Sequence, residues 1–317
     1  MEVSELLERY EQGERDFAGA NLQGADLRRK TLVGVNLAGA NLMGASLQHA
    51  FLTKSNLSEA FLNWANLSFV KLSEGHIADA DLTKANLSGA FLVKSNLVRT
   101  KLSGAVLSSA NLRGADLRNV NFCGADLREI NLRNANLTRA NLNWANLSGA
   151  RLSGAVLQGA FLNEVNLSSA FLNGVNLSGL DLSEVNLKDA KLNGANLQRT
   201  KLRATNLSEA MLQGTNLMGA DLTRANLQGA VMMRADLTWA NLCQANLGES
   251  DLRGANVLGT KIDGAEFTDT RLSEAARRYL CLIATGMAER THQETWSTLQ
   301  CGVSCSVQAA SPTWKLA

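Results

Sequence analysis

Residues 20–29 read ANLQGADLRR, which is two copies of one five-residue unit. Each copy has a small residue, then Asn or Asp, then Leu, then two mostly polar residues. The unit repeats without insertion or deletion from a central residue at Phe17 to one at Leu272, giving 52 units, and Leu holds the central position in 45 of them. The exceptions are also apolar: Phe17, Ile77, Phe122, Met232, Val257, Ile262 and Phe267. Most of the chain is therefore a single uninterrupted repeat.

A period of five fits neither a helix, whose faces repeat every 3.6 residues, nor a flat strand, which repeats every two. The position two residues before each central Leu is also restricted, with Ala in 32 of the 52 units. In extended backbone, residues two apart point to the same side, so the small residue and the Leu share an interior. Frequent Gly at the last position indicates a recurring turn.

The pattern resembles the pentapeptide-repeat family over residues 15–274, and the opening LLERYEQGERDF at residues 6–17 looks like the cyanobacterial members. The resemblance implies an all-β solenoid, a right-handed quadrilateral β-helix in which four units make one coil. It also implies about 13 coils, and at ~4.8 Å per hydrogen-bonded layer the rod would be roughly 60 Å long.

Four units carry a residue other than the expected small one at the inward position: Arg15, Lys30, Ile130 and Leu180. Arg15 lies at the end of the repeat, where its side chain can reach water. At Lys30 we expect a local distortion or a stem that extends along the first coil to bring its charge to solvent.

Both flanks of the repeat are predicted to be helical and to cover the unpaired edges of the solenoid. Residues 3–12 have apolar residues at helical spacing, with Ser4 as the expected N-cap, and Ser273 is expected to cap a second helix that runs to about Arg290. The predicted divisions are an N-terminal capping helix (1–14), the β-helix (15–274), a C-terminal capping helix (275–290) and a weakly ordered tail (291–317).

The composition excludes several classes of protein. The 317 residues carry a net charge of +2, and no apolar run approaches the ~18 residues of a membrane span. The N-terminus lacks the basic and apolar regions of a secretory signal. The five Cys are sparse and irregular, so we expect no disulfide framework and a cytoplasmic location.

Catalytic and metal-binding patterns are not apparent. His49 and His76 fall on outward positions without a Ser–His–Asp arrangement around them, and no Gly-rich nucleotide loop links a strand to a helix. Cys301 and Cys305, with His292 the nearby His, lack further zinc ligands. We therefore expect no enzyme activity, no cofactor and no metal.

In a four-sided rod, residues 20 apart stack on one face. Two opposing faces carry ladders of Asn and Asp, which suit hydrogen bonds between coils. A third face carries Phe51, Lys71, Phe91, Asn111, Asn131, Arg151, Phe171 and Lys191, and the face opposite it carries Phe61, Asp81, Lys101, Asn121, Asn141, Phe161, Asp181 and Lys201. Exposed Phe interleaved with cations is typical of protein interfaces, and also of surfaces that stack nucleic-acid bases. Alternatively, Phe simply suits a β surface.

Two further groups are candidates for partner binding. Trp64 and Trp144 lie 80 residues apart in identical sequence contexts, either as corner residues that cover backbone or as partner anchors. Arg113 and Arg133 would stack on adjacent layers within a patch of mixed charge. The predicted partner-binding residues are Phe51, Phe91, Phe171, Lys71, Arg151, Trp64, Trp144, Arg113 and Arg133.

These observations predict a non-enzymatic scaffold that binds a partner protein in a regulatory role, as the resemblance to cyanobacterial members also implies. The alternative is a DNA mimic directed at a type II topoisomerase, a role of some members with strongly acidic rods. Residues 15–274 instead hold 26 Lys and Arg against 22 Asp and Glu. We expect no nucleic-acid or membrane partner, and either a monomer or an end-to-end homodimer.

Overall fold

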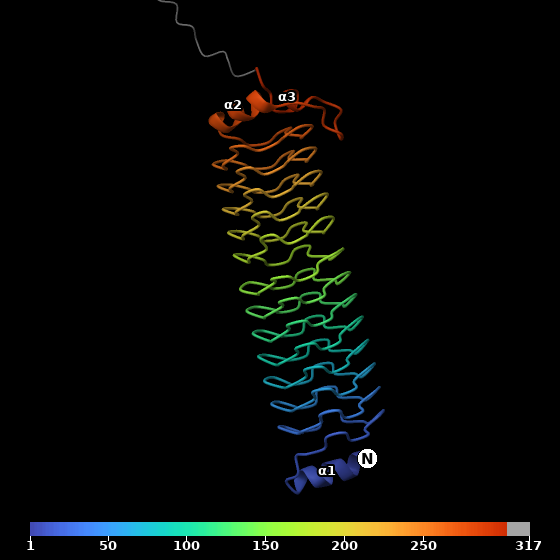
Figure 1. The fold of residues 1–317 in the computed structure, drawn as a ribbon. Helices are drawn as coiled ribbons and strands as arrows, with labels where there is room; N and C mark the ends of the chain where they lie inside the picture. Colours follow the sequence, from blue (N-terminus) through green and yellow to red (C-terminus); the bar gives the residue numbers. More distant parts are fainter. Residues whose placement is uncertain (303–317) are drawn as a thin grey trace, which may run out of the picture.

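The computed structural model describes residues 1–302, which form a straight rod with a helix at each end (Figure 1). Helix α1 spans Val3–Glu11, α2 spans Glu274–Ile283, and the short α3 spans Thr295–Thr298. Between α1 and α2 the chain forms parallel bridges, each joining a residue to the one 20 positions later, from Asp16↔Asn36 to Asp251↔Arg271. Because the unit has five residues, four units make one coil.

The unit satisfies its backbone N–H groups in a fixed way, as residues 136–140 show. The N–H groups of Asn136, Leu137 and Arg139 donate to carbonyls of the adjacent coils at 3.0, 2.8 and 2.9 Å. The N–H of Thr138 donates to the Oδ1 atom of Asn136 at 3.0 Å. The N–H of Ala140 donates to the carbonyl of Leu137 at 3.0 Å and closes the corner. This explains the frequent Asn or Asp before each Leu, because its side chain accepts the N–H that the coils leave free.

The last residue of each unit from Gly19 to Asp269 adopts a left-handed conformation, with φ of 68° at Gly149 and 58° at Arg139. Glycine adopts this conformation without strain, whereas other residues incur about 1–2 kcal/mol. The same residue donates its N–H to the next coil, which offsets the strain. Corners can therefore carry residues as large as Trp144, whose side chain is directed outward.

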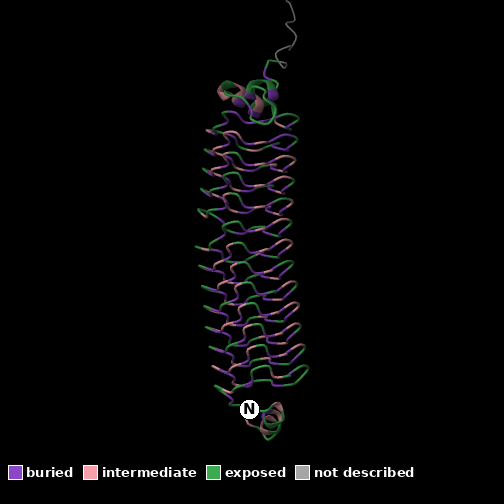
Figure 2. Ribbon diagram, turned by 90° about the vertical axis from the view of Figure 1, so that its right-hand side faces the viewer, coloured by how far each residue is buried: buried purple, intermediate pink, exposed green. Residues whose placement is uncertain are grey.

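The interior is a continuous column of Leu and small residues. Buried residues recur in every coil along the rod (Figure 2). Where Thr replaces Ala, as at Thr100 and Thr200, its buried hydroxyl donates to a backbone carbonyl at 2.8 and 2.9 Å. Ile130 is fully buried in a small-residue position. Lys30 is exposed at the N-terminal end of the rod, so its charge reaches water as expected.

The ends differ from the sequence-based boundaries. The N-cap of α1 is Glu2, which makes no side-chain capping hydrogen bond, and not Ser4. The Ser273 side chain accepts the N–H of Ala276, as predicted. Helix α2 ends at Ile283 and not near Arg290, because the chain turns back toward the last coil.

The prediction of a weakly ordered tail is wrong for residues 291–302, whereas residues 303–317 lie outside the described part of the chain. Residues 291–302 include α3, and Glu294 pairs with Met287 in an antiparallel bridge. The hydroxyl of Thr298 accepts the N–H of Phe267 at 3.2 Å. Contacts with the last coil, and not a periodic pattern, order this segment.

A disulfide joins Cys281 of α2 to Cys301, although the sparse and irregular cysteines predicted no disulfide framework. It also removes Cys301 from any metal site, and Cys305 lies among the residues not described. Sequence spacing gave no sign of this bond, because the turn after α2 brings the two residues together.

The disulfide is predicted to hold the C-terminal segment 284–302 against the rod. Replacing Cys281 and Cys301 by Ser should lower the free energy needed to open this segment by about 3 kcal/mol, the value for a loop of this size. Amide hydrogen exchange should accelerate in residues 284–302 and remain unchanged in the coils. Equal protection of this segment in both proteins would show that the hydrogen bonds alone hold it.

Glu266 is predicted to make the packing of segment 284–302 against the rod sensitive to acid. Burial alone would raise the pKa of Glu266, but hydrogen bonds from Thr268 and Thr291 outweigh burial and lower it. A carboxylate whose pKa is lower in the folded protein stabilises the fold at any pH above its pKa in the unfolded chain, which is about 4.3. This stabilisation is lost as the pH falls through the pKa that the group has in the folded protein. Amide exchange near Thr291 should therefore rise below about pH 4.3. The variant Glu266→Gln should lack this pH dependence, and a retained dependence would contradict the assignment.

Candidate interaction surface

A groove of about 680 Å³ runs along one face of the rod. One wall is formed by the corner residues Gly89, Ser109, Glu129, Gly149, Ser169 and Asp189, and the other by Phe91, Asn111, Asn131, Arg151, Phe171 and Lys191. In each coil the two walls are two residues apart, on either side of a small inward residue. We call this depression the Phe91–Lys191 groove.

The groove combines aromatic rings with charges of both signs. The Phe91 and Phe171 side chains are 38% and 41% exposed, and they lie four coils apart, which is about 19 Å at the usual layer spacing. Glu129 and Asp189 lie on one wall and Arg151 and Lys191 on the other. Within residues 1–302 none of these four charges forms an ion pair, so all four remain available to a partner.

The structure brings several predicted residues together. Phe91, Arg151 and Phe171 all line the groove. The Lys71 ammonium lies 3.1 Å from the centroid of the Phe91 ring, a cation–π contact. Phe51, which is 46% exposed, forms a β-bridge with Lys71. We call the column of residues 20 apart from Phe51 to Lys191 the stripe. It is continuous from Phe51 into the groove.

The remaining candidates divide between two faces. Arg113 and Arg133 are exposed on the groove face, each two residues after a residue of the stripe. Trp64 and Trp144 lie on the opposite face, at left-handed corners, and are 59% and 57% exposed. A partner bound to the groove face alone would therefore not contact the two Trp residues.

The acidic wall was missed by the sequence reasoning. Glu129 and Asp189, with Ser109 and Ser169, lie two residues before members of the stripe and repeat at the same spacing of 20. This signal was present in the sequence.

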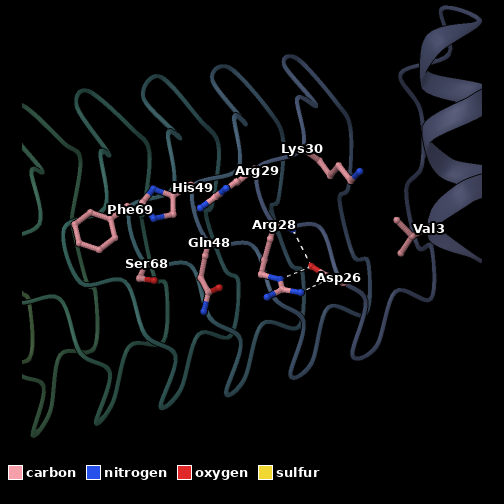
Figure 3. Close-up of a pocket in the computed structure, with 9 residues that line it drawn as sticks. All are labelled: Val3, Asp26, Arg28, Arg29, Lys30, Gln48, His49, Ser68 and Phe69. Carbon is pink, nitrogen blue, oxygen red and sulfur yellow. Dashed lines mark hydrogen bonds and ion pairs between the residues drawn. The ribbon is translucent and has the colours of Figure 1, made fainter.

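A second depression, of about 710 Å³, lies near the N-terminal end of the rod (Figure 3). Arg29, His49 and Phe69 project from successive corners, and the His49 ring stacks on Phe69 with centroids 5.0 Å apart. Hydrogen bonds from the Arg28 guanidinium lower the pKa of Asp26 to about 2. This depression is basic and open, and it contains none of the predicted partner-binding residues.

Other classes of site find no support in the described part of the chain. No group of three or more His, Cys, Asp or Glu residues within residues 1–302 is arranged to hold a metal ion. No helix in the same range is long and apolar enough to cross a bilayer. Cys123 and Cys243 are free thiols on outward positions.

The chain belongs to the pentapeptide repeat family. The model for "Pentapeptide repeats" matches in successive windows from residues 20–58 to 230–273. Members form right-handed quadrilateral β-helices and generally act as structural or binding proteins. No curated protein matches the sequence.

Several solved structures are similar to this chain. HetL, involved in heterocyst differentiation regulation in the cyanobacterium Nostoc sp. strain PCC 7120, is 31% identical over 84% of this chain and 96% of HetL, with a TM-score of 0.24. A pentapeptide repeat protein of the Arabidopsis thaliana thylakoid lumen is 34% identical over 42% of this chain and 92% of its own, with a TM-score of 0.41. QnrB1, a plasmid-mediated fluoroquinolone resistance protein, is 18% identical over 68% of this chain and 94% of its own, with a TM-score of 0.31.

The exposed Phe residues are predicted to contribute little to folding. Phe171→Ser should lower the free energy of unfolding by no more than about 1 kcal/mol, the range of β-surface preferences. Leu172→Ala, at the neighbouring buried position, should lower it by about 2–5 kcal/mol. Urea unfolding of both variants measures the difference. Equal losses would assign Phe171 to the fold and not to a binding surface.

Proposed function

We propose that this chain is a non-enzymatic scaffold that binds a partner protein through the Phe91–Lys191 groove and the adjoining Phe51 and Lys71. The observation that carries the proposal is the pair of exposed Phe rings, four coils apart, in a groove whose walls hold unpaired charges of opposite sign. Aromatic anchors surrounded by polar groups are the usual composition of protein interfaces.

The charges favour a protein partner over a nucleic acid. Glu129 and Asp189 would face the phosphates of any strand that lay in the groove. The reading as a DNA mimic is also disfavoured, because the repeat carries slightly more cations than anions. HetL, which takes part in regulating heterocyst differentiation, provides a precedent for a regulatory role.

The finer features of the rod are part of the proposal. We infer about 13 coils, with α1 and α2 as caps, because Leu6 of α1 and Leu280 of α2 are buried against the core. Covered ends favour a monomer over an end-to-end dimer. The cytoplasmic location stays a prediction, and the Cys281–Cys301 disulfide is more typical of an oxidising compartment.

Affinity capture from a cell lysate tests the proposal. The variant with Phe51, Phe91 and Phe171 replaced by Ser should lose a stoichiometric protein that the unchanged chain retains. The matched control replaces Phe61 and Phe161, exposed on the opposite face, and should retain it. Equal capture of the protein by both variants would show that the groove face is not the binding surface. Trp64 and Trp144 would then be the next candidates.

A further inference from the structure

The backbone ladder between coils is interrupted at one place. Bridges join Asn136 to Val156 and Asn176 to Asn196, but within residues 1–302 none joins Val156 to Asn176, or Phe161 to Asp181. The coils part on one side near the middle of the rod (Figure 2). We call this opening between residues 154–164 and 173–183 the seam.

Hydrogen bonds define the seam more sharply. The N–H groups of Leu157, Gly159 and Leu162 form no backbone hydrogen bond to the next coil, whereas the equivalent groups one coil earlier donate at 2.8, 2.9 and 2.9 Å. The N–H groups of Asn176 and Asp181 also lack the usual bond to the coil before them. A cleft of about 410 Å³ opens there, lined by Leu157, Gly159, Asn176 and Leu180 among others.

Leu180 accounts for the position of the seam. It occupies an inward position that is Ala in most units, and both it and Ala160, one coil earlier, are only partly buried. A side chain too large for its site displaces neighbouring backbone. Ile130 shows the contrast, because it is fully buried in the equivalent kind of position and the coils around it stay joined.

The other two sides of the same layer remain bonded. The Leu152 N–H donates to the Phe171 carbonyl at 2.9 Å, and the Leu167 N–H donates to the Asn186 carbonyl at 2.8 Å. The corner between these two sides carries Gly149 and Ser169, which belong to the acidic wall of the groove. The rod is thus open on one corner and held at the diagonally opposite corner.

We propose that the seam is a hinge about which the two halves of the rod bend, with an axis that crosses the rod and passes through the held corner at Gly149 and Ser169. Regions with few backbone hydrogen bonds open most readily, so motion concentrates at the seam. Bending there changes the curvature of the Phe91–Lys191 groove, which crosses the same layer. The effect on a partner rests on the proposed function, but the hinge itself does not.

Amide hydrogen exchange tests the seam without any partner. The amides of Leu157, Gly159 and Leu162 should exchange at least about tenfold faster than those of Leu137, Arg139 and Leu142. In Leu180→Ala the ladder should close and these rates should become equal. In the control Ile130→Ala the seam amides should remain fast. Equal rates in the unchanged protein, or seam amides in Leu180→Ala that stay fast, would overturn the proposal.

Distances between paired spin labels test the hinge axis. Labels at Asn119→Cys and Arg199→Cys flank the open side, and labels at Ser109→Cys and Asp189→Cys flank the held side, both with Cys123 and Cys243 replaced by Ser. Each pair is four coils apart, about 19 Å. The open-side distribution should be the broader one and should narrow in Leu180→Ala. Distributions of equal width, or no narrowing, would refute the hinge even if a partner binds the groove.

Discussion

The structure depends on one constraint, which is that backbone groups of each five-residue unit must pair with groups 19 or 21 residues away in the chain, in the adjacent coils. A short extended piece followed by a left-handed corner meets this requirement on all four sides of the coils, except on the two open sides of the seam. The Leu side chains and small residues then fill the interior, and the Asn or Asp side chain accepts the N–H that would otherwise have no partner. The hydrophobic column and the ladder therefore support each other.

This constraint also decides where function can lie. Within residues 1–302 the core is filled with Leu and small residues, and the two largest depressions described lie on the outside of the rod. The outward residues are arranged in columns along the rod, and a partner that lies along the rod would contact the residues of one column together. The Phe91–Lys191 groove is the place where two neighbouring columns, one with Phe, Arg and Lys and one with Glu and Asp, form opposing walls.

The sequence predicted the repeat, the two inward positions and the Phe stripe, because each follows from a fixed period. It could not predict the Cys281–Cys301 bond or the order in residues 291–302, since both arise from a turn without periodicity. Leu180 was recognised as an exception to the small-residue rule, but its effect could not be inferred. Ile130 breaks the same rule and fits, so the outcome depends on local packing.

Photo-crosslinking in cells tests the central claim, that the groove face is the interaction surface, most directly. Asn111 and Asn121 are matched positions on opposite faces, and each accepts a side-chain hydrogen bond at 3.2 Å from the Asn one coil later. A photoreactive amino acid at position 111 should capture one partner protein, and the same residue at position 121 should capture none. Capture only from position 121 would place the interface on the opposite face and contradict this account.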